Sequence, residues 1–225
     1  MTTHRAQQTV GVLALQGGVA EHLRMIEGLG ARAVPVRGRD QLAGPDGARV
    51  DALILPGGES TVIDRLLRLL DLFEPLRDAV GSGVPTLGTC AGLVLLASRI
   101  RDPAPGQRSL GVLDVEVGRN AFGPQAASSE GAFAVEGVAG SGPDGAVRGA
   151  LIRAPEVLAV GQGARVIASS AGRIVGVTSA GRGVPSSSGS STRPALGHVT
   201  GVSFHPELCG DPALHLALMD RAAAR

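Results

Sequence analysis

Short apolar runs alternate with segments of helical periodicity along the first hundred residues. Apolar runs that end at glycine or proline predict strands, and these lie at 10–15, 33–36, 51–55 and 84–88. Helical spacing of apolar residues predicts helices over 21–29, from Ser60 or Thr61 onward, and over 91–100. Because strands and helices alternate, the pattern indicates a parallel sheet covered by helices on both faces.

The second half of the chain favours strands. They are predicted at 112–117, 157–160, 166–168, 174–178 and 199–204, before a last helix at 212–223. In the helix after Ser60, the apolar stripe that should face the sheet is formed by Val62, Leu66, Leu69 and Leu70.

Two stretches, 101–108 and 181–194, are predicted as loops. The second is rich in serine and glycine, and we expect it to be an exposed surface loop. Neither a repeat nor a second domain boundary is evident, so residues 1–225 are expected to form a single domain.

The composition excludes several kinds of chemistry. All basic residues are arginine and the net charge is +1, so neither a Walker A lysine nor a Schiff-base lysine is available, and no basic cluster suits nucleic acid. Two cysteines without a Cys-x-x-Cys pair encode neither a disulfide framework nor a thiolate zinc site. The polar N-terminus and the lack of an apolar run of ~18 residues favour a cytoplasmic protein without a membrane span.

Cys90 lies in the segment Gly88-Thr-Cys-Ala-Gly92, between a predicted strand and a predicted helix. This is the thiol form of the Gly-x-Ser-x-Gly turn that exposes a nucleophile. The backbone N–H of Ala91 is then a candidate donor to an oxyanion. The alternative is a small, buried, unreactive cysteine.

His205 and Glu207 are the candidate base and its orienting carboxylate. In an extended segment, side chains at i and i+2 face the same side, so Glu207 can hold one ring nitrogen while the other faces Cys90. The alternative is a histidine at a strand end beside an exposed glutamate.

Three further positions are candidates for substrate binding. The Gly58 N–H, at the end of the strand 51–55, is a possible second oxyanion donor. Arg119 and Arg153 adjoin strands, and guanidinium groups suit a carboxylate. Solvated arginines and a simple glycine turn are the alternatives.

The sequence resembles the class I triad glutamine amidotransferases and, more narrowly, the glutaminase subunits of pyridoxal 5′-phosphate synthase. The matching segments span nearly the whole chain: Leu15-Gln-Gly17, Leu55-Pro-Gly-Gly-Glu-Ser-Thr61, Gly88-Thr-Cys-Ala-Gly-Leu-Val-Leu-Leu-Ala97, Arg119-Asn-Ala-Phe-Gly123, Ile152-Arg-Ala-Pro155 and Ser203-Phe-His-Pro-Glu-Leu208. The cysteine and His-Pro-Glu segments specify the broad class, whereas the Gly-Gly-Glu-Ser-Thr, Arg-Asn-x-Phe-Gly and Ile-Arg-Ala-Pro segments specify the narrower family.

The resemblance implies a three-layer, flavodoxin-like α/β fold with a mostly parallel central sheet. It also implies a Cys90–His205–Glu207 triad that hydrolyses L-glutamine without a cofactor or metal. The implied contacts to glutamine are Gly58, Glu59, Ser60, Arg119, Ile152 and Arg153.

The implied partner is the synthase subunit, in a large assembly in which glutaminase activity is weak until the partner docks. Three alternatives remain: a glutaminase of a different synthase, a stand-alone Cys-His-Glu hydrolase or peptidase, and a non-catalytic protein of the same fold.

Overall fold

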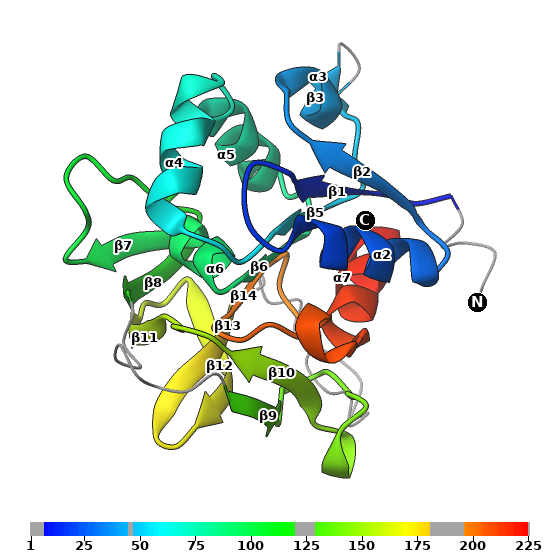
Figure 1. Ribbon diagram of the computed structural model, residues 1–225, viewed down its shortest axis with the longest axis vertical. Helices are drawn as coiled ribbons and strands as arrows, with labels where there is room; N and C mark the ends of the chain where they lie inside the picture. The colour runs from blue at the N-terminus through cyan, green and yellow to red at the C-terminus, as the bar shows by residue number, and fades with distance from the viewer. Residues whose placement is uncertain (1–6, 45–46, 120–128, 181–195, 225) are drawn as a thin grey trace, which may run out of the picture.

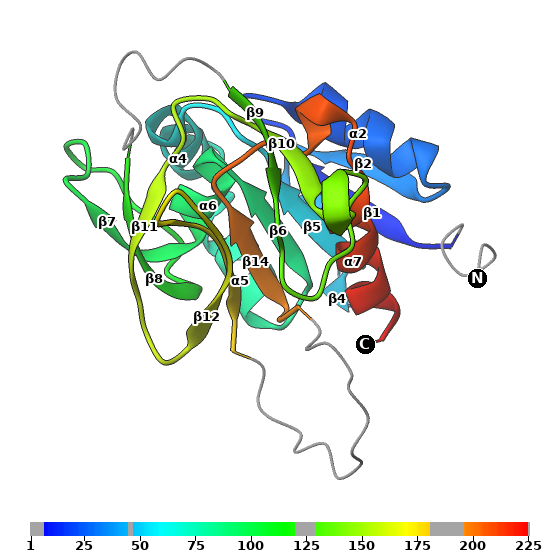
Figure 2. The ribbon, with the colours of Figure 1, turned by 90° about the horizontal axis from the view of Figure 1, so that it is seen from below.

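A computed structural model describes residues 7–44, 47–119, 129–180 and 196–224 (Figure 1). A ten-stranded sheet runs through the molecule in the order β2-β1-β5-β6-β14-β13-β11-β8-β7, with β12 paired to β13. The sheet is mixed and strongly curled (Figure 2). The fold is therefore α/β, and the predicted loop 181–194 lies outside the described residues.

One half of the sheet is parallel. It consists of β2 (Arg32–Val36), β1 (Thr9–Leu13), β5 (Ala52–Leu55), β6 (Thr86–Thr89) and β14 (Val199–Val202). Every residue of the three strands β5, β6 and β14 is buried. Strands covered on both faces read as continuous apolar runs, which explains why this half was predicted from the sequence.

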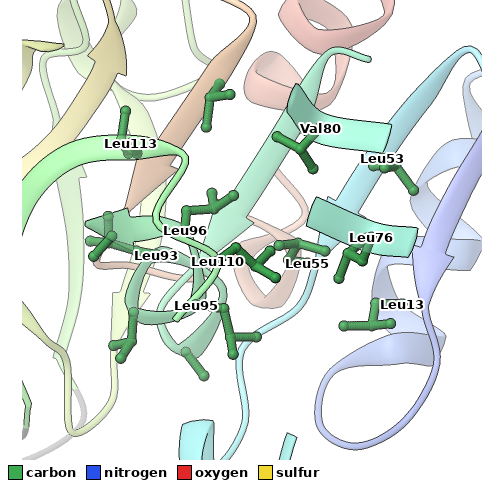
Figure 3. Close-up of a cluster of buried hydrophobic side chains, with 14 of the residues drawn as sticks. Leu13, Leu53, Leu55, Leu76, Val80, Leu93, Leu95, Leu96, Leu110 and Leu113 are labelled. Atoms are coloured by element: carbon green, nitrogen blue, oxygen red, sulfur yellow. The ribbon is translucent and has the colours of Figure 1, made fainter. Parts of the chain in front are cut away.

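Helices cover both faces of the parallel half. On one face, α2 (Val19–Gly28) and α7 (Ala213–Ala223) share a core with β1 and β5, which includes Ile26, Ile54 and Leu214. On the other face lie α4 (Ser60–Leu69), α5 (Phe73–Gly81) and α6 (Ala91–Leu96). Side chains of these helices pack with side chains of the strands in the cluster shown in Figure 3, which includes Leu55 of β5 and Leu93 of α6.

The other half corrects the expectation of a mostly parallel sheet. From β14 onward, β13 (Arg173–Ser179), β11 (Glu156–Val160) and β8 (Leu113–Gly118) join by antiparallel pairs, and β12 (Ala164–Ser170) pairs antiparallel with β13. Only β7 (Ala97–Arg101) adds a parallel pair there, with β8. Because turns rather than helices connect β11, β12 and β13, adjacent segments can pair antiparallel.

Small elements complete the described part. These are α3 (Arg39–Leu42), the hairpins β3 (Ala43–Gly44) with β4 (Gly47–Ala48) and β9 (Ser129–Phe133) with β10 (Val147–Leu151), and the 3₁₀ turns η1 (Pro143–Gly145) and η2 (Glu207–Cys209). Helix α5 and the strands β9 and β10 were not predicted. No helix within the described residues has the length and apolarity needed to cross a membrane.

Two element predictions were wrong. The helix predicted over 91–100 ends at Leu96, and the chain continues as strand β7, because β7 pairs with β8. The predicted apolar stripe of α4 faces outward: the side chains of Val62, Leu69 and Leu70 are exposed, Leu69 to 74%.

The buried face of α4 instead combines apolar and polar residues. Ile63 and Leu67 pack against the sheet, and the polar side chains of Ser60 and Asp64 are buried with them. The Asp64 carboxylate accepts hydrogen bonds from Arg68 and from the backbone N–H of Arg108. Tertiary hydrogen bonds therefore select a face that hydrophobicity alone did not indicate.

Candidate active site

The candidate active site lies where β5, β6 and β14 end. The carboxyl ends of parallel strands meet at one edge of a sheet, which is where ligands bind in such folds. Cys90 follows β6 and His205 follows β14, and the register pairs Thr89 with Val202 next to them. Gly58 follows β5 at the same edge. The parallel half of the sheet therefore brings together residues that lie far apart in the chain.

Cys90 occupies a strained turn between β6 and α6. Its φ is 48° and its ψ is −104°, in a region that residues with a Cβ rarely adopt. Its backbone N–H donates to the Val202 carbonyl at 2.8 Å. A Cβ at Gly92 would collide with the Leu55 carbonyl oxygen, so glycine lets α6 pack closely on β5. This is the geometry of a turn that exposes a nucleophile.

His205 is fixed through its backbone and through its side chain. It exchanges two backbone hydrogen bonds with Ala150 of β10, at 2.9 and 3.1 Å. Its Nδ1 lies 2.7 Å from Oε1 of Glu207, the first residue of η2, and the Glu207 residue is only 6% exposed. The two side chains therefore form a buried hydrogen-bonded pair that leaves the histidine Nε2 for Cys90.

Hydrogen bonds outweigh burial in setting the charges of this pair. Desolvation lowers the pKa of His205, but hydrogen bonds with Cys90 and Glu207 raise it by more, to about 10. Desolvation raises the pKa of Glu207, but hydrogen bonds with His205 and His22 lower it to about 2. Near neutral pH the pair is therefore an imidazolium beside a carboxylate.

A cavity of about 260 Å³ opens beside Cys90. All ten residues singled out from the sequence line it, namely Gly58, Glu59, Ser60, Cys90, Ala91, Arg119, Ile152, Arg153, His205 and Glu207. The volume and the mixture of charged and apolar walls suit a small polar molecule.

The candidate substrate-binding residues reach the cavity from three segments. Glu59 precedes α4, Arg119 directly follows β8, and Ile152 and Arg153 follow β10. Arg153 has a φ of 45°, and the Sγ of Cys90 lies 3.9 Å from the Ile152 carbonyl oxygen. The antiparallel half of the molecule therefore supplies one wall of the cavity.

Sequence reasoning missed two residues that hold this wall in place. Gln107 accepts a short hydrogen bond from Arg119 and donates to Ser60 Oγ at 3.1 Å. Gln16 accepts from the backbone N–H of Glu59 at 2.7 Å, which fixes the turn after β5. The Leu15-Gln-Gly17 segment, which matches the family, could have indicated that Gln16 belongs to the site. Gln107 lies in the predicted loop 101–108, where no motif marks it.

The cysteines and acidic residues show no other site in the described ranges. Cys90 and Cys209 are both free thiols. Within residues 7–44, 47–119, 129–180 and 196–224, no group of three His, Cys, Asp or Glu side chains is arranged to hold a metal ion.

Known proteins resemble this chain in sequence and in fold. A model of the SNO glutamine amidotransferase family matches residues 12–219. Pyridoxal 5′-phosphate synthase subunit PdxT of Acidothermus cellulolyticus is 44% identical over 225 residues, which cover 100% of this chain and 99% of that protein. The same subunit of Cutibacterium acnes is 47% identical over 210 residues, 92% of each chain. A solved structure described as a glutamine amidotransferase has a TM-score of 0.76 at 38% identity and covers 95% of this chain and 98% of that chain.

The curled mixed sheet and the cysteine at its strand–helix turn define a fold like that of the class I glutamine amidotransferases. The matched residues cover most of the chain. The chain belongs to the SNO glutamine amidotransferase family. The resemblance read from the sequence motifs is thereby confirmed.

Proposed function

We propose that this chain hydrolyses L-glutamine to L-glutamate and ammonia, as the glutaminase subunit of pyridoxal 5′-phosphate synthase. Family membership supports this function, and the relatives that match along their full length carry that subunit's name. The observation that carries it is local: Cys90 sits on a strained turn in a cavity, beside a buried His205–Glu207 pair.

In the first half of the proposed reaction, Cys90 attacks as the thiolate beside the His205 imidazolium. The sulfur bonds to the side-chain amide carbon of glutamine, and the carbonyl oxygen becomes an oxyanion. The backbone N–H groups of Gly58 and Ala91 stabilise it, and losing one such donor costs roughly 10²–10³ in rate. The carbon–nitrogen bond then breaks, His205 gives its proton to the leaving nitrogen, and ammonia departs.

In the second half, water hydrolyses the thioester. His205, now neutral, takes a proton from the water as its oxygen attacks the thioester carbon. The carbon–sulfur bond breaks, glutamate leaves, and the Cys90–His205 pair returns to its starting state. Glu207 remains a carboxylate throughout and keeps the imidazole in one orientation.

Charge complementarity supports the proposed binding of glutamine. Arg119 and Arg153 line the cavity, and guanidinium groups suit the α-carboxylate. The Glu59 carboxylate suits the α-ammonium group. Ser60 and Ile152 line the same cavity and add contacts to the side chain of the substrate.

We further infer that the chain works with a synthase subunit. Free ammonia is easily protonated or lost, so it is best passed directly to the protein that uses it. We expect a large hetero-oligomer, weak glutaminase activity until the synthase subunit docks, and a cytoplasmic location.

We also infer that the 225 residues form one domain. The parallel half of its sheet is flavodoxin-like, because the five strands of that half, numbered by their order in the chain, lie side by side in the order 2-1-3-4-5.

The test is glutamate release from glutamine, with and without the synthase subunit, for the wild type and for Cys90→Ala. We expect strong stimulation of the wild type by the partner and no turnover by the variant. Full activity without the partner would point to a stand-alone hydrolase. Turnover by Cys90→Ala would refute the proposed triad.

A further inference from the structure

A row of buried polar side chains lies behind the His205–Glu207 pair. His22 on α2 and His215 on α7 are both fully buried, as is Thr89 at the end of β6. Figure 1 shows α2 and α7 near each other, beside the segment that contains η2. The row therefore connects two helices to the carboxylate of Glu207.

The hydrogen bonds in this row are consistent with one set of tautomers. His215 Nε2 lies 2.9 Å from His22 Nδ1. His22 Nε2 lies 3.3 Å from Thr89 Oγ1 and 3.5 Å from Glu207 Oε1. We assign the His22 proton to Nε2, because the Glu207 carboxylate can only accept, and in this tautomer Nδ1 accepts from His215.

This assignment also explains an atom without a partner. The Nδ1 of His215 is buried and has no hydrogen-bond partner among the described residues. With the proton on Nε2, this Nδ1 is a bare acceptor rather than an unsatisfied donor. All N–H groups of the row then point toward Glu207.

Packing alone does not explain two buried imidazoles. Their neighbours on the same helices, Ile26, Leu214 and Leu218, form an apolar core with the sheet. Burying a polar ring beside such residues costs free energy unless the ring is hydrogen-bonded, and a leucine would fill the space without that cost. The polar groups that His22 contacts outside the histidine pair are the Thr89 hydroxyl and the Glu207 carboxylate, and only Glu207 belongs to the proposed triad.

We propose that His22 is a positioning residue, which holds the Glu207 carboxylate so that Oε1 stays directed at His205 Nδ1, and that His215 fixes the ring of His22. The inference rests on the proposed function, because it assigns His22 a part in the same triad. His22 does not line the cavity, and its contact with the proposed triad is the one with the Glu207 carboxylate.

The charges around the row fit this role. Desolvation lowers the pKa of His215 to about 3, so its ring stays neutral and can donate to His22. The charged or titratable groups that face the row are Glu207, with His205 and Cys90 beyond it, Asp211 next to His215, and Glu21 on α2 beside the loop at Gly18. His22 thus lies between a neutral histidine and the Glu207 carboxylate.

Two variants separate the hydrogen bond from packing. His22→Met and His22→Gln introduce unbranched side chains of similar length, and only glutamine can donate to Glu207. His198→Gln is the matched control, because His198 bonds to Ser179 at the far end of β14. Two rates are measured: alkylation of Cys90 by iodoacetamide against pH, followed by mass spectrometry to separate it from Cys209, and glutamate release with the synthase subunit.

We expect Cys90 alkylation and glutamate release to be slower in His22→Met than in the wild type. In His22→Gln both rates should be close to those of the wild type. A loosened carboxylate stabilises the His205 imidazolium less, so the midpoint of Cys90 alkylation rises by about one pH unit, which makes the rate about tenfold lower at any pH below both midpoints. The kcat for glutamine falls about tenfold with KM changed less than twofold, and His198→Gln behaves like the wild type.

The inference is overturned if the pH profile of Cys90 alkylation in His22→Met matches the wild type. It is also overturned if His22→Met and His22→Gln lose these two rates, alkylation and glutamate release, to the same extent. If His22→Met does not fold, the same measurement is made on His215→Met. A smaller rise in the alkylation midpoint then supports the inference, whereas an unchanged midpoint overturns it. Wild-type protein that alkylates at Cys90 but releases no glutamate would defeat the proposed function alone, since the alkylation rates still decide the role of His22.

Discussion

Gln107 offers a sharp test of how the cavity holds its substrate. Its side-chain oxygen accepts from Arg119 and from the backbone N–H of Ala104, and its nitrogen donates to Ser60. It touches none of the proposed reacting atoms. Replacing it by alanine therefore releases two side chains of the proposed glutamine site and leaves Cys90 and His205 in place.

The size of the effect follows from the two lost hydrogen bonds, of the three, that reach side chains of the proposed glutamine site. A hydrogen bond to a charged group contributes about 1.5–3 kcal/mol and a neutral one about 0.5–1.5 kcal/mol. Gln107 is half-buried, so water replaces part of both contacts. We expect Gln107→Ala to weaken glutamine binding by about 1–2 kcal/mol, which raises KM roughly 5- to 30-fold. The kcat should change less than about twofold.

The assay is the rate of glutamate release against glutamine concentration, in the presence of the synthase subunit. Gln41→Ala is the control, because Gln41 also accepts two hydrogen bonds, from the backbone N–H groups of Arg37 and Gly38, but lies at α3 away from the cavity. Its KM should match the wild type. A fall in kcat at constant KM in Gln107→Ala would refute the reasoning, since it would place Gln107 in the chemical step.

Three further predictions use other parts of the structure. Cys90→Ala should abolish glutamate release while binding to the synthase subunit, measured by sedimentation, stays intact; residual turnover would contradict this. The pKa of Glu207 is lowered from 4.5 to about 2, so its contribution to the free energy of unfolding, about 3 kcal/mol, is present above pH 4.5 and lost as pH falls toward 2. Urea unfolding of wild type and Glu207→Gln should show a stability difference that shrinks over this range, and a constant difference would argue against it. Gly92→Ala should destabilise the protein by about 1–3 kcal/mol, because its Cβ meets the Leu55 carbonyl, whereas Gly28→Ala in open space at the end of α2 should not; equal urea midpoints would refute the packing argument.

Several features of the site were predictable because the relevant signals are local in sequence. The glycines beside Cys90 indicate a sharp turn, and the spacing of His205 and Glu207 allows contact between them without any knowledge of the fold. The structure brings these residues and the predicted binding residues to one cavity. Gln107 and His22 were missed because their partners lie 47 and 193 residues away, at Ser60 and His215. Contacts over such separations leave no periodic pattern.

The sequence by itself determined that the first half of the chain forms a parallel sheet, because short apolar runs such as Ala52–Leu55 alternate with helical segments. It also determined the family, because the motifs occur along nearly the whole chain. Only the tertiary structure decided which face of α4 is buried, where α6 ends, and that the rest of the sheet is largely antiparallel. The physical reason is the same in each case. Pairing with β8 turns residues 97–101 into a strand, and the backbone N–H of Arg108 bonds to Asp64 on the buried, mixed face of α4, so neighbours distant in the chain override local preference.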